Sequence, residues 1–341
     1  MALIAELGER LEALVRARSG RSDACVVDVT PLPGHSGLTY SFEVHYRSGG
    51  QAAAEKQVLR LAPPGVPASG PNDVVRLGKI MESMAQRGIP VPPVRWYDDD
   101  ARWFGTAFCV VGFMPGERLV LGPRSFGPGE VRGLAPQAIG AMALLHSLEW
   151  RELAGVWGAP VSLRAELERL SGLLKRPRLE PEIAVLARRL GEQITARVPQ
   201  EEDFRCVHGD FQWSNLLFDS GRLSAVLDWE LAHLGQAPVD LGWLMLFSDV
   251  ESWDGSDLVP QGAPGPRDLL ELYNAHQERP RAFEELCWFR AFAAYRFAVI
   301  TAFNLMLHRA GKRPDAKWEE IALSMPRLIR RAERLLRPAA S

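Results

Sequence analysis

Three side chains with oxygen donors lie close together in the sequence, each beside an apolar run: Asp210, Asn215 and Asp228. Asp210 ends a His-Gly-Asp, Asn215 follows five residues later, and Asp228 opens an Asp-Trp-Glu. Carboxylate and carboxamide oxygens are suitable ligands for magnesium. Phosphoryl transfer requires a metal on the nucleotide oxygens and a group that orients the attacking hydroxyl. The pattern therefore predicts Asp210 as the catalytic base and Asn215 and Asp228 as metal ligands.

Two short apolar segments separate Asn215 from Asp228. Residues 216–218 and 223–227 are expected to form strands, joined by a turn at residues 219–222. Because Asn215 precedes the first strand and Asp228 follows the second, a hairpin would hold the two side chains at the same end.

The combined motif resembles the aminoglycoside phosphotransferase and choline kinase family, whose members are relatives of the protein kinases. The resemblance rests on His-Gly-Asp at 208–210, the asparagine at 215 and Asp-Trp-Glu at 228–230. The run that continues to Asp-Leu-Gly-Trp at 240–243 is similar to the kinase-like domains associated with acyl-CoA dehydrogenases. Either half of the motif alone would be weak, whereas the pair is specific.

This resemblance implies an α+β, protein-kinase-like, two-lobed fold. We expect an N-terminal nucleotide-binding lobe at residues 1–112 with a small antiparallel sheet, a hinge at 113–116, and a mainly helical C-terminal lobe at 117–341. It also implies that His208 and Asp240 support the catalytic loop rather than act as bases.

A turn with two glycines, Pro-Gly-His-Ser-Gly at 33–37, connects the first two expected strands. Glycine lets backbone N–H groups come close to phosphate oxygens. The resemblance makes this the nucleotide loop, with Gly34, Ser36 and Gly37 nearest the phosphates. An ordinary hairpin turn is the alternative interpretation.

Arg60 stands on the expected strand where protein kinases carry a lysine that contacts the nucleotide phosphates. A guanidinium can bind phosphate oxygens with two N–H groups. Kinases pair that lysine with a glutamate on the next helix, but Leu77 or Gly78 occupies that place, and Asp73 and Glu82 are the nearest acids. The sequence leaves open whether Arg60 has an acidic partner on this helix.

The apolar segment 108–112, followed by Pro115-Gly116, resembles the strand that leads into the kinase hinge. There the backbone from Val111 to Phe113 would hydrogen-bond a nucleobase. A core strand followed by a turn would have the same pattern.

The chain has 341 residues with 47% hydrophobic residues and a net charge of −2, which is ordinary for a globular protein of about two domains. Lysine and arginine are dispersed, so neither nucleic acid nor an anionic membrane is expected as a partner. The four cysteines are far apart and suggest reduced thiols. No apolar run is long enough for a membrane span. We expect a soluble cytoplasmic protein, either a monomer or a homodimer.

Hydrophobic periodicity predicts the main elements. Strands are expected at 25–29, 40–47, 55–61 and 108–114, and helices at 1–20, 72–86, 133–149, 163–174, 182–196, 285–310 and 326–338.

Two features give opposite indications about the substrate. The acidic loop 249–257 could attract a cationic acceptor or could be merely solvated. Arg290 and Arg296 lie on an apolar helix and need partners, either an anionic acceptor or an internal carboxylate. The identity of the acceptor therefore does not follow from the sequence.

The predicted function is magnesium-dependent transfer of the γ-phosphate of ATP or GTP to the hydroxyl of a small molecule. The acceptor would be an antibiotic, an amino alcohol or a hydroxyacyl-type metabolite. The short segment between Asp228 and Asp240 has no room for an activation segment, which argues against a protein substrate. A pseudokinase that binds nucleotide without turnover and a metal-dependent phosphoester hydrolase are the alternatives. A zinc site at His208 and Asp210 is the alternative metal site, and it would need a further nitrogen or sulfur ligand at suitable spacing.

Overall fold

The computed structural model describes residues 2–32, 38–63, 65–119, 126–176, 179–255 and 258–337. The chain forms two compact units. The first contains Met1–Pro115 together with Ser224–Leu231, and the second contains Gly116–Leu223 and Ala232–Ser341. The predicted lobe limits and hinge remain predictions.

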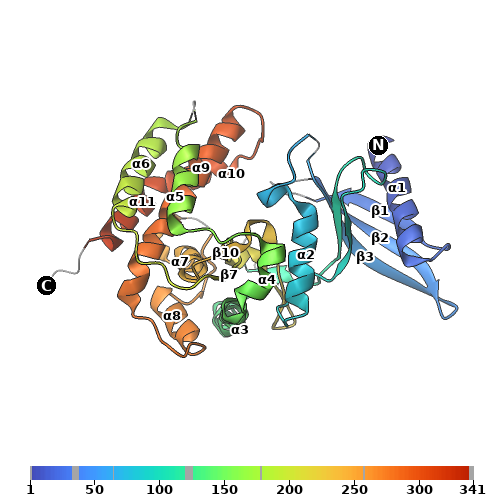
Figure 1. The fold of residues 1–341 in the computed structure, drawn as a ribbon, viewed down its shortest axis with the longest axis horizontal. Helices are drawn as coiled ribbons and strands as arrows, with labels where there is room; N and C mark the ends of the chain where they lie inside the picture. The colour runs from blue at the N-terminus through green and yellow to red at the C-terminus, as the bar shows by residue number, and fades with distance from the viewer. Residues whose placement is uncertain are drawn as a thin grey trace. The chain divides into compact units, whose positions relative to one another are not determined.

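The first unit is built on a five-stranded antiparallel sheet with the strand order β1-β2-β3-β5-β4 (Figure 1). β2 and β3 are joined by a turn at Gly49-Gly50, where both residues have positive φ angles. β3 lies between β2 and β5, so Arg60 on β3 is opposite Thr39 on one side and Cys109 on the other. The strands are Cys25–Pro31, Leu38–Ser48, Gln51–Leu61, Val94–Asp98 and Phe108–Gly112 for β1 to β5.

Helix α1 (Ala2–Ser19) supplies one side of the core of this unit. Its apolar positions recur at helical spacing, and Leu11 and Leu14 are fully buried. They belong to the same apolar cluster as Phe42, Leu59 and Val110 of the sheet. The amphipathic helix predicted at the N-terminus is therefore confirmed.

Helix α2 (Val74–Ala85) has Asp73 as its N-cap, since the carboxylate of Asp73 accepts a hydrogen bond from the backbone N–H of Arg76 at 2.8 Å. The proline-rich segment before it contains a short 3₁₀ turn, η1 (Gly70–Asn72). The first unit ends with η3 (Trp229–Leu231), which contains part of the Asp-Trp-Glu motif.

The second unit is mainly helical, and α9 (Cys287–Arg309) lies at its centre (Figure 1). Helices α6 (Pro181–Thr195), α7 (Pro238–Leu246) and α11 (Met325–Leu335) pack against it. Among the described residues, one helix, Phe283–Arg309, is long and apolar enough to cross a membrane, but 83% of its most apolar stretch is buried. Such burial is typical of a core helix.

Short strands in the second unit hold the loops of interest. β7 (Arg205–Val207) pairs with β10 (His233–Gly235) in antiparallel register, and β6 (Glu117–Arg118) pairs with β8 (Leu216–Asp219). β9 (Arg222–Val226) follows β8 after a two-residue turn, Ser220-Gly221, in which both φ angles are positive. The hairpin turn expected at residues 219–222 is thus confirmed.

The other helices of the second unit include both expected and unexpected elements. Helix α3 (Pro128–Ser147) begins earlier than expected and contains Pro136, while α5 (Leu163–Leu173) matches the expected helix. Other elements have no counterpart in the prediction: α4 (Trp150–Trp157), α8 (Pro266–Asn274), α10 (Lys317–Leu323), and the 3₁₀ turns η2 (Trp213–Asn215), η4 (Val250–Ser252) and η5 (Phe283–Leu286).

Candidate active site

The segment that follows β7 forms the candidate catalytic loop, residues 208–215. Gly209 has a φ of 80°, a left-handed conformation that glycine adopts without strain. His208 is fully buried, and its Nδ1 accepts a hydrogen bond from the backbone N–H of Asp210 at 3.1 Å. The sequence His-Gly-Asp therefore makes a tight turn that presents Asp210 at its end.

Asp240, at the start of α7, anchors this loop through its backbone N–H groups. Its carboxylate is fully buried and accepts hydrogen bonds from the backbone N–H groups of His208 at 2.7 Å and Gly209 at 2.8 Å. Nε2 of His146 on α3 lies 3.2 Å from the same carboxylate. These contacts are those expected of a residue that braces the loop, the role that the resemblance implies for Asp240.

The electrostatic environment of Asp240 favours its charged form. Burial alone would raise its pKa, but the hydrogen bond and charge of His146 and the contacts with His208 outweigh burial and lower the pKa below its ordinary value. Nδ1 of His146 lies 2.8 Å from the hydroxyl of Tyr273, so the imidazole is held on both sides. Burial raises the pKa of Tyr273, so this hydroxyl stays protonated.

The carboxylate of Asp210 receives hydrogen bonds from three side-chain N–H groups. Gln212 Nε2 and Trp243 Nε1 donate to Oδ1, each at 2.8 Å, and Asn215 Nδ2 donates to Oδ2 at 2.8 Å. Asn215 Nδ2 also contacts the backbone oxygen of Asp210 at 2.9 Å. Three donors fix the orientation of this half-buried carboxylate, as a positioned base requires.

Trp243 was not among the residues predicted for the site, although the Asp-Leu-Gly-Trp string that contains it had been noted. Its ring packs beneath a buried cation, because the guanidinium carbon of Arg296 lies 4.6 Å from the ring centroid. Arg296 is paired in turn with the buried Glu166 at 3.7 Å. The alternative of an internal carboxylate partner for Arg296 is therefore the correct one.

Asn215 is well placed to contribute an oxygen ligand. Both of its hydrogen bonds to Asp210 come from Nδ2, which leaves the carboxamide Oδ1 as the atom that a metal ion would contact. Among the described residues, no three His, Cys, Asp or Glu side chains gather as a metal-binding group. A magnesium site can have fewer than three protein ligands, because the ion keeps several waters and also binds the phosphate oxygens of the nucleotide.

The other predicted metal ligand, Asp228, belongs to the first unit. It has a φ of 62°, a conformation in which Asp is one of the few tolerated non-glycine residues. Its Oδ1 lies 3.7 Å from Nη1 of Arg60, and its side chain is 38% exposed. A carboxylate next to one cation and open to solvent fits the chemistry of a metal ligand.

Arg60 has an acidic partner that the sequence analysis did not find. Its Nη2 forms an ion pair with the carboxylate of Glu230, the last residue of Asp-Trp-Glu. Both side chains are about five-sixths buried, with exposures of 16% and 15%. The sequence offers one signal for this pairing, the acid two positions after Asp228. The structure shows that η3 brings Glu230 to Arg60 on β3.

Gly78, one of the two residues that could match the position of this acid in protein kinases, has no room for a side chain. A side chain at Gly78 of α2 would meet the ring of Tyr97, with Cβ only 2.5 Å from Cδ1. Asp73 is used as the N-cap, and Glu82 accepts a hydrogen bond from the hydroxyl of Tyr97 at 2.9 Å. Neither of the two acids considered from the sequence contacts Arg60, and Glu230 takes their place.

The predicted nucleobase contacts fall at the end of β5. The backbone N–H of Phe113 donates to the oxygen of Lys56 at 2.9 Å, and that of Gly112 donates to Pro93 at 2.8 Å. Val111 pairs with both β3 and β4. The nucleobase contact therefore remains a prediction. Residues Gly34, Ser36 and Gly37 of the predicted nucleotide loop lie outside the described residues.

Known proteins resemble this chain in sequence. Residues 33–267, more than half of the chain, match the model of the phosphotransferase enzyme family. The chain is 25% identical over 264 residues to mouse acyl-CoA dehydrogenase family member 10, covering 72% of this chain and 24% of the relative. Rat family member 11 is 29% identical over 225 residues, covering 59% and 27%. The chain thus spans about a quarter of the length of these relatives.

Solved structures resemble the whole chain. A protein from Ralstonia eutropha assigned as an aminoglycoside phosphotransferase has a TM-score of 0.71 at 22% identity, with 96% of each chain covered. The aminoglycoside phosphotransferase APH(4)-Ia, in a ternary complex with AMP-PNP and hygromycin B, has a TM-score of 0.61 at 14% identity, with 95% and 98% covered. The predicted protein-kinase-like α+β fold is confirmed by these likenesses, and the chain belongs to the phosphotransferase enzyme family.

Proposed function

We propose that this protein transfers the γ-phosphate of ATP to the hydroxyl of a small molecule, with Asp210 as the base. The observation that carries the proposal is the carboxylate of Asp210, held by three N–H donors in a loop anchored by Asp240. A fixed carboxylate at this place is what a hydroxyl acceptor needs for its proton to be removed as phosphate is transferred. Membership of the phosphotransferase family supports the same reaction class.

The donor and the metal follow from chemistry and likeness together. APH(4)-Ia has been solved with AMP-PNP, an analogue of ATP, which favours ATP over GTP here. Asn215 and Asp228 would hold magnesium, which neutralises charge on the nucleotide oxygens when bound. Arg60, held in place by Glu230, would contact the phosphates through its guanidinium.

The pseudokinase alternative loses part of its support. It rested on the arginine at position 60 and on the missing helix glutamate, which would position that arginine. Arg60 is held instead by Glu230 and lies beside Asp228. An ordered cation next to a candidate metal ligand favours a working site over a degraded one.

The acceptor is proposed only as a class, a small molecule with a hydroxyl group, in a cytoplasmic protein that is a monomer or homodimer. Hygromycin B is bound by APH(4)-Ia, while the sequence relatives carry acyl-CoA dehydrogenase names. These two comparisons point to different acceptors, an antibiotic or a hydroxyacyl-type metabolite.

The test is transfer of labelled γ-phosphate from ATP and magnesium to a panel of hydroxyl compounds or to water. The native protein should release or transfer label, and Asp210→Asn should be slower by roughly 10²–10⁴, the usual contribution of a positioned base. Asp219→Asn, an exposed carboxylate at the end of β8, is the matched control and should keep the native rate. Equal rates for native protein and Asp210→Asn would overturn the assignment of the base.

A further inference from the structure

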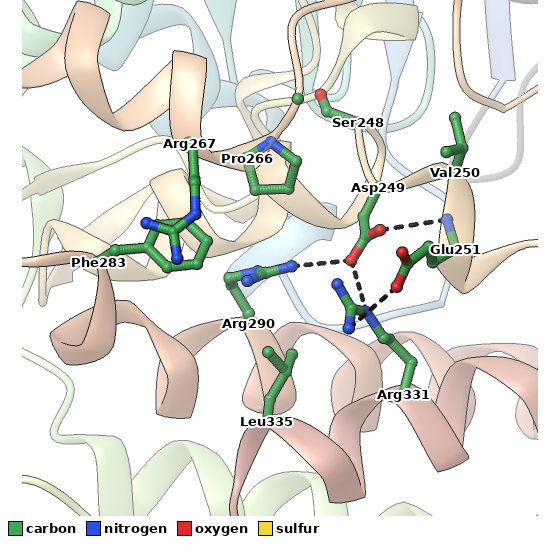
Figure 2. Close-up of a pocket in the computed structure, with 11 residues that line it drawn as sticks. Ser248, Asp249, Val250, Glu251, Pro266, Arg267, Phe283, Arg290, Arg331 and Leu335 are labelled. Atoms are coloured by element: carbon green, nitrogen blue, oxygen red, sulfur yellow. Dashed lines mark hydrogen bonds and ion pairs between the residues drawn. The ribbon is translucent and has the colours of Figure 1, made fainter. Parts of the chain in front are cut away.

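A pocket of about 450 Å³ lies in the second unit, away from the residues assigned above (Figure 2). Its walls come from the loop after α7, the start of α8, the η5–α9 region and the last turns of α11. Its volume is within the range of roughly 300–1,000 Å³ that is usual for sites of small molecules. None of the proposed catalytic or metal-binding residues lines it.

The charged groups of this pocket do not balance. Three arginines and two carboxylates line it, which leaves one positive charge in excess. The buried carboxylate of Asp249 is shared by Arg290 Nη2 at 2.8 Å and Arg331 Nε at 3.0 Å, and Glu251 pairs with Arg331 at 3.1 Å (Figure 2). Arg290 is 4% exposed, so its charge is built into the core of the unit.

Arg267 supplies the excess charge. Within the part of the chain that the structure describes, no carboxylate lies within 4 Å of its guanidinium as an ion-pair partner. Its guanidinium carbon instead lies 4.1 Å from the centroid of the Phe283 ring, and that of Arg290 lies 5.1 Å from the same ring. Figure 2 shows Arg267 stacked on Phe283 at the side of the pocket. Two guanidiniums thus share one aromatic ring, with a single buried carboxylate between Arg290 and Arg331.

The other features of the pocket lining fit a ligand that has an anionic group and an uncharged part. A guanidinium has five N–H donors, and Arg290 uses one of them on Asp249. Gly265 and Pro266, the N-cap and first residue of the nine-residue helix α8, also line the pocket and add the positive end of a helix. Leu335 and Phe283 provide apolar surface.

We propose that this pocket binds a small molecule carrying a phosphate or similar oxyanion. Such a group would offset the excess positive charge and accept hydrogen bonds from Arg267 and Arg290 in the forked geometry that guanidiniums favour. The proposal goes beyond the phosphotransferase activity and does not rest on it.

The pocket is connected to the catalytic loop by one hydrogen bond. Ser248, which lines the pocket, accepts from Nε1 of Trp213 at 3.0 Å, and Trp213 lies between Asp210 and Asn215 in sequence. Ser248 and Trp213 are both buried. An anion that orders the loop at Ser248 and Asp249 would therefore act on a residue adjacent in structure to the candidate base.

The experiment is calorimetric titration with sodium pyrophosphate in the presence of EDTA, at an ionic strength matched with sodium chloride. The native protein should bind pyrophosphate, and Arg267→Gln should bind about tenfold more weakly, a loss of roughly 1.4 kcal/mol. Arg313→Gln, an exposed arginine of the same unit, should bind as the native protein does. Arg60→Gln should also bind normally, which separates this pocket from the proposed nucleotide site.

Arg331→Gln is the second variant, since it leaves Asp249 paired with Arg290. Arg267 is exposed, so its replacement should leave the unfolding midpoint without pyrophosphate unchanged. Three results would overturn the proposal: no binding beyond the matched chloride, native affinity in both Arg267→Gln and Arg331→Gln, or a loss of affinity in Arg60→Gln alone.

Discussion

Trp243 connects the candidate base to a buried charge in the core. Its indole N–H donates to Asp210, while its ring lies against Arg296, which is paired with Glu166. A cation on the face of the ring draws electron density from the indole, so the N–H becomes a stronger donor to the carboxylate. Asp210 is thus oriented by the core of the second unit as well as by its own loop.

Trp243→Phe should slow γ-phosphate release by about tenfold, because a hydrogen bond to a charged group is worth roughly 1.5–3 kcal/mol and only part of it acts in the reaction. Trp253→Phe is the matched control. The ring of Trp253 stacks on Phe247, which also contacts Trp243. Its indole N–H donates to a backbone oxygen of α7 at 2.9 Å and not to Asp210. Both variants should lose similar stability. If Trp253→Phe slowed the reaction as much as Trp243→Phe, loss of packing rather than of the hydrogen bond would explain the effect.

Asp240→Asn should destabilise the protein by about 3–5 kcal/mol at pH 7, as expected when one member of a buried charged network is replaced. The folded-state pKa of Asp240 is lowered. The stability that its carboxylate contributes is therefore fully present above the unfolded-state pKa of about 3.9 and is lost as the pH falls through the folded value. The difference in unfolding free energy between native protein and Asp240→Asn should shrink below about pH 4.

Urea unfolding between pH 3 and pH 7 measures this difference. Glu149→Gln is the control, because its pKa is also lowered but its side chain is exposed, and it should change the stability little. A difference for Asp240→Asn that stays constant across this pH range would show that folding does not lower the pKa of Asp240.

At the scale of elements, local signals predicted most of what positions the site. The turn at Ser220-Gly221 and the long apolar helix could be predicted from the sequence, because each depends on neighbouring residues. The pairing of Arg60 with Glu230 was not, since the two residues are 170 positions apart and meet only through the tertiary fold. The contact between Trp243 and Asp210 was missed for the same reason.

Gly78→Ala tests why α2 lacks the acid of the protein kinases. The new Cβ would lie 2.5–3.0 Å from three atoms of Tyr97, so the substitution should cost about 1–3 kcal/mol through overpacking. Gly133→Ala in α3 is the control, because nothing lies within 4 Å of its Cβ position and the change should stabilise by up to about 1 kcal/mol. Urea unfolding of both variants measures the contrast, and a neutral or stabilising Gly78→Ala would contradict the packing explanation.

At the scale of the whole molecule, the residues predicted for the site are divided between the two compact units. Asp210 and Asn215 belong to the second unit, whereas Asp228, Arg60 and Glu230 belong to the first. The motif is nevertheless continuous in the sequence, because β8 and β9 carry the chain from the residues of the second unit to those of the first. The chemistry of the motif could thus be predicted from sequence, while its division between units could not.

The measurement that tests the central claim most directly is thermal unfolding with ATP or GTP, each with and without magnesium, on the native protein and on Asp228→Ala. A ligand that binds only the folded state raises the midpoint, by an amount equivalent to about 2.7 kcal/mol at a hundred times its Kd. We predict a magnesium-dependent rise for the native protein that Asp228→Ala abolishes and that the exposed control Asp219→Ala retains. No shift with either nucleotide at millimolar concentration, or an undiminished shift in Asp228→Ala, would contradict the proposed nucleotide and metal site.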